Sequence, residues 1–281
     1  MKRKANAPRL REVIVAAILL VIALFYLLPI VWMIAASFQG EGEIFKIPFN
    51  WLPLKEGTLN SYRFALTNGQ MLPAFMNSIK AAAALVLIQV SLSTITGYVM
   101  CKYNFRFKNA AFIFIMMTLM VPPELTYFPL FDIVKHLHIT NSTLGLIFPF
   151  IYSGFGIIYM RQFSTYIPNE ILEAARIDGC GHIRTFFSVA LPMLKGAVSG
   201  LMILAFTFIW SEFAWARSII TQDNAKTLAL SLTQLAAGTD NYINYAALTA
   251  GGVLVMAPVL IIYLIFQKNF IESVAKSGLK G

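Results

Sequence analysis

The stretch IPNEILEAARIDGCGHIRTFFSVALP, residues 167–192, is a polar interruption in a chain that is otherwise mostly apolar. Pro168 and the two polar residues after it are typical of a helix start, because the first turn of a helix needs no N–H from proline. Gly179 predicts the end of this helix, because glycine readily adopts the left-handed conformation that ends helices. A second helical run continues to Pro192. The stretch is therefore predicted to contain two short helices joined by a glycine turn.

The first of these helices has an apolar side and a mixed side when its residues are placed at intervals of about 100°. The apolar side contains Pro168, Ile171, Leu172, Ala174 and Ala175. The other side contains Asn169, Glu170, Glu173, Arg176 and Ile177. In the second run, one face contains Ile183, Phe186, Phe187, Ala190 and Leu191. A thin helix with a mixed face suits insertion into a groove on another protein; the alternative is an amphipathic helix on the membrane surface, whose polar face is usually rich in Lys and Arg.

A particular spacing runs through this stretch: Glu173-Ala174-Ala175, three residues, Gly179, nine residues, Val189, one residue, and Leu191-Pro192. This spacing resembles the EAA signature of ABC importer permeases, in which an isoleucine usually takes the position of Val189. In that family the loop docks as a coupling helix into a cleft of the ATPase subunit.

By this resemblance, one set of residues couples the chain to an ATPase: Glu173, Ala174, Ala175, Ile177, Gly179, Phe186, Phe187, Leu191 and Pro192. Glu173 would make a polar contact with the ATPase, and Gly179 would form the turn between the two helices. Ile177, Phe186 and Phe187 would make apolar contacts, either with the ATPase or with the membrane spans.

The composition is that of a membrane protein. Of the 281 residues, 58% are hydrophobic and 12% are charged, whereas soluble domains have about 25% charged residues. The mean hydropathy is +0.70. The net charge of +9 comes from basic residues scattered at the ends of apolar runs, without the contiguous patch typical of nucleic-acid binding. We therefore expect an all-α, multi-pass protein that contacts membrane lipid and no nucleic acid.

The sequence contains no set of residues typical of an enzyme. It has no GxxxxGK phosphate-binding loop, no GxSxG motif and no HExxH motif. Cys101 and Cys180 have no cysteine or histidine companion at the spacing of metal ligands. We therefore expect no catalytic residue, metal or cofactor on this chain. If ATP drives the protein, ATP and Mg²⁺ must bind to a partner chain.

Six apolar runs predict six membrane-spanning helices, at 13–37, 75–101, 110–131, 143–160, 196–215 and 245–266. Pro122, Pro123 and Pro129 should break the outer part of the third. No seventh span is expected in 217–244, which lacks about twenty successive apolar residues. The chain is expected to form a single transmembrane domain, 1–281, with an N-terminal tail at 1–12, a coupling loop at 164–195 and a C-terminal tail at 268–281.

The basic residues predict the orientation of the chain in the membrane. Fifteen of the 22 Lys and Arg residues lie on the side of the membrane that contains the tails and the coupling loop. The other seven lie on the opposite side. The positive-inside rule therefore places both termini and the coupling loop in the cytoplasm.

Glu212 lies in the outer part of the fifth expected span, about 24 Å along the helix from its start. A charged side chain near mid-bilayer costs about 2.5–3.5 kcal/mol, so it generally faces a wet cavity or a partner. Glu212, Trp210 and Trp215 could line a route for a polyhydroxylated substrate, because carboxylates accept hydrogen bonds from hydroxyl groups and aromatic rings stack on sugars. The alternative is an interfacial position at the level of the lipid headgroups. Glu124 and Tyr127 are further candidates, with an outer-loop position as their alternative.

Three other segments are similar to those of carbohydrate-importer permeases: LLPIVWMIAASF at 27–38, FIWSEFAW at 208–215 and SGLKG at 277–281. The chain looks most like the shorter permease of maltose-type transporters, over residue 13 to the C-terminus. The resemblance implies an inner-membrane permease for a sugar or oligosaccharide. It also implies two ATPase subunits, an extracytoplasmic solute-binding protein, and a second permease subunit that is either a different chain or another copy of this one.

Two other functions remain open from the sequence. An ABC permease for a non-sugar solute, such as an amino acid or phosphate, would share the coupling loop and differ only in cargo. An ion-driven secondary transporter or a channel would need no ATPase. Such proteins usually contain inverted repeats and charged mid-membrane pairs, and we find neither in the sequence.

Overall fold

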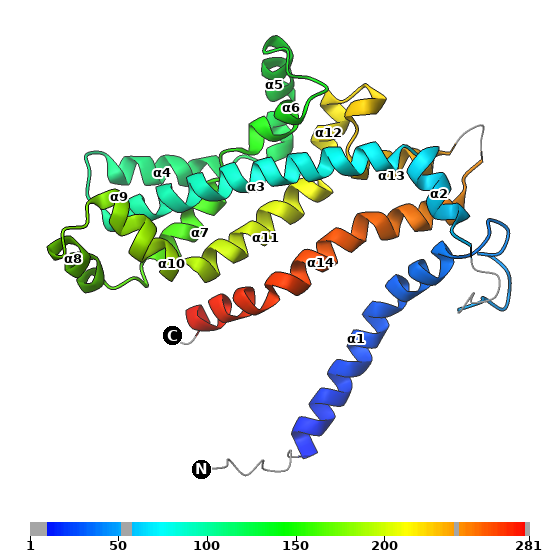
Figure 1. Ribbon diagram of the computed structural model, residues 1–281, viewed down its shortest axis with the longest axis horizontal. Coiled ribbons are helices and arrows are strands. Elements are labelled where there is room, and N and C mark those ends of the chain that lie inside the picture. Colours follow the sequence, from blue (N-terminus) through cyan, green and yellow to red (C-terminus); the bar gives the residue numbers. More distant parts are fainter. Residues whose placement is uncertain (1–9, 52–57, 239–241, 279–281) are drawn as a thin grey trace. The chain divides into compact units, whose positions relative to one another are not determined.

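The computed structural model describes residues 10–51, 58–238 and 242–278, with side chains as far as residue 267. The regular elements in these residues are all helices (Figure 1), so the expected all-α class is confirmed. The chain divides into two compact units, residues 1–69 with 234–254 and residues 70–233 with 255–281. Parts of the expected tails, 1–9 and 279–281, lie outside the described residues.

The first unit contains α1 (Leu10–Ser37), α2 (Asn60–Thr67) and the beginning of α14 (Tyr245–Gly278). α1 is long and apolar enough to cross a membrane and covers the first expected span. Its last turns form a small core with the start of α14, made of Ala36, Ile44 and Ala246, with Trp32 and Phe49 packed against it.

The second unit is built around α3 (Met71–Lys102), which covers the second expected span. α7 (Gly154–Ser164) and α11 (Lys195–Ser211) pack along α3, and the later part of α14 runs beside α11 (Figure 1). Nε1 of Trp210 on α11 donates a 2.9 Å hydrogen bond to the carbonyl oxygen of Val255 on α14.

Small residues allow α3 and α7 to approach each other closely. A Cβ atom added to Gly97 would lie 2.7 Å from the backbone nitrogen of Arg161 and 2.8 Å from the carbonyl oxygen of Ile157. A Cβ atom added to Gly156 would lie 2.6 Å from Oγ of Ser93. The two helices therefore pack almost backbone to backbone where they cross.

Three of the six expected spans are bent pairs of shorter helices. α4 (Lys108–Thr118) and α5 (Pro123–His136) meet at 98°, residues 143–150 and α7 meet at 54°, and residues 182–193 and α11 meet at 78°. Within the described residues, three helices are long enough to cross a membrane, and six spans result if each bent pair forms one. The expected break at Pro122 and Pro123 is confirmed, but the one expected at Pro129 is wrong, because α5 continues through Pro129 to His136.

The fourth expected span, 143–160, is not one straight helix, which corrects the expectation. α6 (Thr143–Ile147) and a 3₁₀ turn, η1 (Phe148–Phe150), end before residue 151, and α7 begins after Ser153. Oγ of Ser153 accepts a 3.0 Å hydrogen bond from the N–H of Gly156. The carbonyl oxygen of Phe150 accepts a 2.6 Å hydrogen bond from Nε2 of Gln89 on α3. The break is tolerated because side chains replace the lost helical hydrogen bonds.

The fifth and sixth spans end at residues other than the expected 215 and 266. α11 ends at Ser211, and α12 (Ala214–Ile219) follows because Glu212, with ψ at 118°, leaves the helical conformation. α14 continues to Gly278, through most of the expected C-terminal tail. The segment between them contains η3 (Asp223–Ala225) and α13 (Leu228–Ala237), and the ten residues of α13 are too few to cross a membrane.

The close crossing of α3 and α7 predicts that Gly97→Ala destabilises the protein. The added Cβ meets backbone atoms that must move, so we expect a loss of about 1–3 kcal/mol and a lower melting temperature. Thermal denaturation of the detergent-purified protein measures this. Gly42→Ala is the matched control, because no atom lies within 4 Å of the added Cβ. Equal melting temperatures for the two variants would contradict the close crossing.

Candidate functional site

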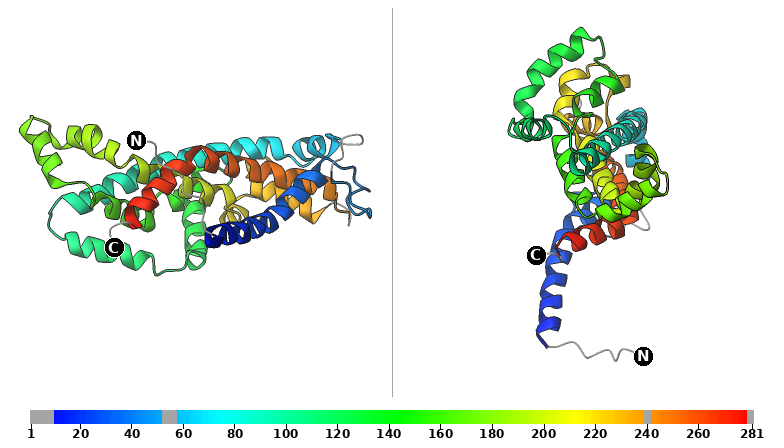
Figure 2. Two further views of the ribbon diagram at one scale, coloured as in Figure 1. Left: turned by 90° about the horizontal axis from the view of Figure 1, so that it is seen from below. Right: turned by 90° about the vertical axis from the view of Figure 1, so that its left-hand side faces the viewer.

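The polar stretch folds into consecutive short helices at the end of α3 (Figure 2). They are α8 (Asn169–Ile177), α9 (His182–Thr185), a π-helical turn, η2 (Phe186–Ala190), and α10 (Leu191–Met193). We call residues 169–193 the α8–α10 segment. α8 begins one residue later than expected, with Pro168 in an extended conformation as its N-cap.

Lys102, the last residue of α3, holds the start of α8 in place. Its Nζ donates hydrogen bonds to the carbonyl oxygen of Ile167, at 2.5 Å, and to Oδ1 of Asn169, at 2.9 Å. The charged donor therefore ties the chain before and after Pro168 to α3.

Gly179 ends α8 as expected, with a left-handed φ of +82°. The N–H of Gly179 donates to the carbonyl oxygen of Arg176 at 3.0 Å, and the N–H of Cys180 donates to that of Ala175 at 2.9 Å. This pair of hydrogen bonds is the Schellman motif, which satisfies the last carbonyl groups of a helix. No atom lies within 4 Å of a Cβ built on Gly179, so the turn faces open space.

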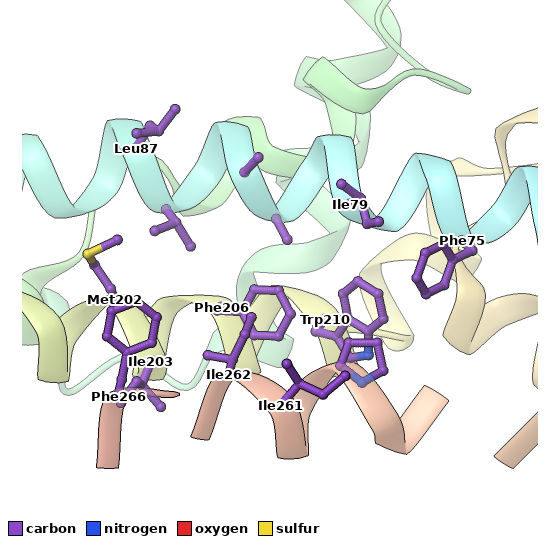
Figure 3. Close-up of a pocket in the computed structure, with 14 residues that line it drawn as sticks. Phe75, Ile79, Leu87, Met202, Ile203, Phe206, Trp210, Ile261, Ile262 and Phe266 are labelled. Carbon is purple, nitrogen blue, oxygen red and sulfur yellow. The ribbon is translucent and has the colours of Figure 1, made fainter. Parts of the chain in front are cut away.

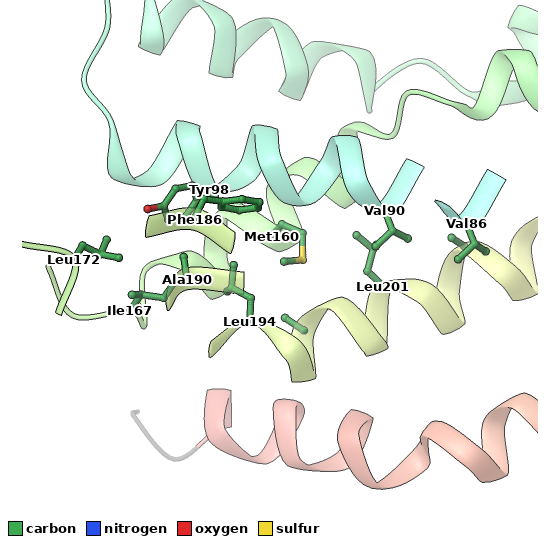
Figure 4. Packing of buried hydrophobic residues seen from close by; sticks show 12 residues of the cluster. Val86, Val90, Tyr98, Met160, Ile167, Leu172, Phe186, Ala190, Leu194 and Leu201 are labelled. Carbon is green, nitrogen blue, oxygen red and sulfur yellow. The ribbon is translucent and has the colours of Figure 1, made fainter. Parts of the chain in front are cut away.

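One side of α8 packs into the main core of the second unit. Leu172 is buried there together with Ile167, Phe186 and Tyr98 (Figure 4), and Ala175 on the same side of α8 is also buried. The expected apolar side is only partly buried, because Ile171 and Ala174 are exposed. Glu170, Glu173 and Ile177 are also exposed, and Ile177 keeps 86% of its surface accessible. α8 thus has one fixed side and one free side, and the free side carries both carboxylates and a large apolar residue.

The second helical run divides its expected common face between two environments. Phe186 is buried against Tyr98, with ring centroids 5.1 Å apart, whereas Ile183 and Phe187 are 77% and 56% exposed. Ala190 is buried, Leu191 is half-buried and Pro192 is exposed. Adjacent residues of a helix lie about 100° apart, so Phe186 and Phe187 stand at different edges of the expected face, and Phe186 is the one that packs against Tyr98.

Tyr103, which was not among the expected site residues, joins α3 to both short helices. Its hydroxyl lies 3.1 Å from Nδ1 of His182 on α9, and the guanidinium of Arg176 on α8 lies 5.8 Å from its ring centroid. The ring also packs edge-on against Tyr98. The only signal in the sequence is an aromatic residue directly after the last residue of a span.

Four of the five expected substrate-pathway residues come together in the second unit; we call Glu124, Tyr127, Glu212 and Trp215 the Glu212 cluster. Oε1 of Glu212 accepts a 2.6 Å hydrogen bond from the backbone N–H of Trp215. The rings of Tyr127 and Trp215 lie 5.7 Å apart, and both carboxylates act electrostatically on Tyr127. Trp215 is fully buried, and its Nε1 donates a 3.1 Å hydrogen bond to the carbonyl oxygen of Gly145.

Trp210 packs with a different set of residues. It stacks on Phe206 at 5.2 Å and meets Phe75 edge-on at 5.8 Å, between α3, α11 and α14 (Figure 3). Only 1% of its surface is exposed. Trp210 is therefore a packing residue that contacts Phe75, Phe206 and Val255.

The residues that the structure describes offer no evident metal centre. Among them, no three His, Cys, Asp or Glu side chains lie close enough together to hold an ion. Cys101 and Cys180 are both half-buried free thiols. The α8–α10 segment and the Glu212 cluster offer hydrogen-bonding groups and apolar side chains for contact.

Comparison with known proteins gives a consistent family and fold. Residues 89–276 match the family described as binding-protein-dependent transport system inner membrane component. The arabinooligosaccharides transport system permease protein AraQ of Bacillus subtilis is 30% identical over 264 residues, which cover 93% of this chain and 93% of that protein. The sn-glycerol-3-phosphate transport system permease protein UgpE of Pectobacterium atrosepticum is 27% identical, over 88% of this chain and 89% of that protein.

A solved structure shows the same fold. It is the crystal structure of a bacterial ABC transporter involved in the import of the acidic polysaccharide alginate. One of its chains matches this one with a TM-score of 0.82 and 20% identity, over 96% of this chain and 100% of that chain. The described helices therefore have a membrane permease fold.

The two hydrogen bonds from Lys102 predict that Lys102→Met loosens the first turn of α8. Hydrogen bonds from a charged donor contribute about 1.5–3 kcal/mol, so we expect the amide hydrogens at the start of α8 to exchange at least about tenfold faster. Hydrogen–deuterium exchange with mass spectrometry measures this. Lys80→Met, on the exposed surface of the same helix α3, is the control and should leave exchange in 165–175 unchanged. Unchanged exchange in Lys102→Met would show that the two hydrogen bonds do not hold α8.

Proposed function

The chain belongs to the family of binding-protein-dependent transport system inner membrane components, and from this premise we propose that it is the permease subunit of an ATP-driven ABC importer for a sugar or oligosaccharide. The observation that carries the proposal is the α8–α10 segment, whose buried side is fixed to the spans and whose free side is available to a partner. The name of the Bacillus subtilis relative supports a saccharide cargo. The name of the Pectobacterium relative supports the alternative, a phosphorylated polyol.

In this proposal the chain forms one transmembrane domain, 1–281, with six spans and with both termini and the 164–195 loop in the cytoplasm. The three long helices and three bent pairs support six spans, and the excess of basic residues supports the orientation. The α8–α10 segment is then a coupling loop between the fourth and fifth spans. The tails at 1–12 and 268–281 lie on the same side as the loop.

The partners follow from the family. Two ATPase subunits bind ATP and Mg²⁺, an extracytoplasmic solute-binding protein delivers the cargo, and a second permease subunit completes the pathway. When ATP closes the ATPase pair, the motion is transmitted through the α8–α10 segment, and the spans change from one open side to the other.

The structure supports a division of roles within the coupling loop. Glu173 and Ile177 lie on the free side of α8, where they meet the ATPase, and the small Ala174 lets it approach closely. Phe186 packs into the core of the spans, and Ala175 is buried on the same side of α8 as Leu172. Because these buried residues and Lys102 fix the segment to α3, a push on the free side moves the spans instead of bending the loop. Phe187, Leu191 and Pro192 complete the surface of the second run.

The Glu212 cluster is our candidate for contact with the cargo. Glu212 is half-buried, Tyr127 is half-buried and Glu124 is exposed, so these three residues can offer hydrogen-bonding groups to hydroxyls. Trp215 cannot stack on a sugar in this conformation because it is fully buried, and it acts by holding Glu212. Trp210 supports the helices around the pathway.

We expect Gly179→Asp to abolish uptake while the protein stays in the membrane at a normal level. The added side chain meets no atom, so the cost is confined to a non-glycine residue in the left-handed conformation, about 1–2 kcal/mol, and to a changed turn at the ATPase contact. Radiolabelled oligosaccharide uptake and co-purification of the ATPase chain measure the effect.

Gly181→Asp is the matched control for this variant. Gly181 also faces open space, but its φ of −66° suits any residue, and it is the N-cap of α9, where aspartate is favoured. We expect uptake by Gly181→Asp to remain close to that of the wild type. Normal uptake by Gly179→Asp at normal membrane levels would contradict the coupling role, and a wild-type chain that never co-purifies with an ATPase would contradict the importer.

For the cargo contact, Glu212→Gln should raise the KM for uptake by roughly fivefold. The amide oxygen can still accept the hydrogen bond from Trp215, so the fold is kept, but a hydrogen bond to a charged group contributes about 1 kcal/mol more than one to a neutral group. Uptake rates at several sugar concentrations measure this. Asp132→Asn, at an exposed carboxylate further along α5, should leave KM unchanged. An unchanged KM for Glu212→Gln would remove Glu212 from the pathway.

A further inference from the structure

Three adjacent cavities lie along α3 and share lining side chains, and we call them together the groove. An outer section of about 560 Å³, between α3, α11 and α14, is shown in Figure 3. It shares Leu87 and Met202 with a middle section of about 210 Å³. The middle section shares Ile95, Phe186 and Phe187 with an end section of about 560 Å³ beside α9. The groove thus follows α3 to its end.

The chemical character of the groove changes along its length. The middle section is lined by apolar side chains and two hydroxyl groups, those of Ser91 and Thr94. The end section contains stronger hydrogen-bonding groups, those of Tyr103, Asn104 and His182, beside aromatic rings. An occupant with an apolar body and a polar end would match this change.

The polar end of the groove lies in a basic part of the chain. The segment 102–108 contains Lys102, Arg106 and Lys108 and no acidic residue. Lys102 and Lys108 are held by backbone carbonyl groups, whereas the side chains of Arg106 and of Arg184 on α9 are exposed. The charge at this end therefore complements an anionic group.

The middle section is long and narrow. Its lining residues on α3 run from Val86 to Ile95, which is about 14 Å along a helix axis. A volume of about 210 Å³ over this length corresponds to a mean cross-section of about 15 Å². This cross-section suits a single chain of methylene groups, whose carbon atoms pack at about 4 Å, better than a helix about 10 Å wide.

We propose that the middle and end sections bind an anionic phospholipid. One acyl chain lies along α3 between Leu87 and Ile95, and the phosphate group lies beside Tyr103 and His182, within the attraction of Arg106 and Arg184. Because Phe186 and Phe187 line both sections, the lipid also supports the α8–α10 segment. The proposal depends on the membrane location of the chain and does not depend on its cargo.

The test compares two tryptophan substitutions on α3. Ile95 lines the groove and Ile88 lines none of its three sections, and the two are 44% and 39% exposed. The complex, purified in mild detergent, is incubated with phosphatidylglycerol or phosphatidylcholine, and retained lipid is counted by native mass spectrometry. We expect the wild type and Ile88→Trp to retain phosphatidylglycerol and Ile95→Trp to lose it. Equal retention by both variants would overturn the proposal.

Two further measurements keep the proposal testable if Ile95→Trp fails to fold. In Arg106→Gln/Arg184→Gln, the preference for phosphatidylglycerol over phosphatidylcholine should fall by about fivefold for each basic side chain removed. A photo-crosslinker at position 95 should label lipid in membranes. An unchanged preference, or a crosslink to a second permease or an ATPase chain in place of lipid, would assign the groove to another occupant.

Discussion

Helices that break inside an apolar environment leave carbonyl groups that hydrocarbon cannot solvate, so each must find a donor on a neighbouring element. In the second unit, the side chain of Gln89 on α3 donates a hydrogen bond to the carbonyl oxygen of Phe150, and that of Lys102 on the same helix donates one to the carbonyl oxygen of Ile167. The indole N–H of Trp215 donates a hydrogen bond to the carbonyl oxygen of Gly145. These donors fix where the broken helices lie, and they thereby position both the α8–α10 segment and the Glu212 cluster. Several polar side chains of this apolar chain therefore act at places where a neighbouring helix is interrupted.

The same arrangement gives the α8–α10 segment and the Glu212 cluster different mechanical properties. The α8–α10 segment is fixed by Lys102, Tyr103 and the buried Leu172, so its free side can receive a force without losing its shape. The Glu212 cluster joins α5, α6 and α12 through the buried indole of Trp215, and the backbone N–H of the same residue binds Glu212 at the end of α11. In the proposed importer, the α8–α10 segment receives motion from the ATPase. The surroundings of the Glu212 cluster change when the spans move. At Gly97, α3 and α7 cross so closely that neither helix can shift along the other without backbone atoms clashing.

Local features were predictable from the sequence, and features that depend on distant partners were not. The end of α8 at Gly179 and the break at Pro122 follow from the conformations that glycine and proline adopt, which neighbouring residues hardly change. The break before Ser153 depends on Gln89, which lies 61 residues from the carbonyl it satisfies. Glu212 was recognised as unusual, but its place at a helix end depends on a cap to Trp215 that no hydrophobic pattern reveals. The separation of Phe186 from Phe187 was missed because residues about 100° apart were assigned to one face, and which of them is buried depends on Tyr98, far away in the sequence.

The π-helical turn at 186–190 makes chain length a structural constraint in its own right. A π-helical turn accommodates about one residue more than an α-helical turn. Each residue of a helix turns the chain by about 100°, so one residue added or removed between α9 and α11 would rotate α8 and α9 about the helix axis and present another side of α8 to a partner. Insertion or deletion of one residue between the glycine turn and α11 would therefore disturb the presentation of α8 more than most substitutions there.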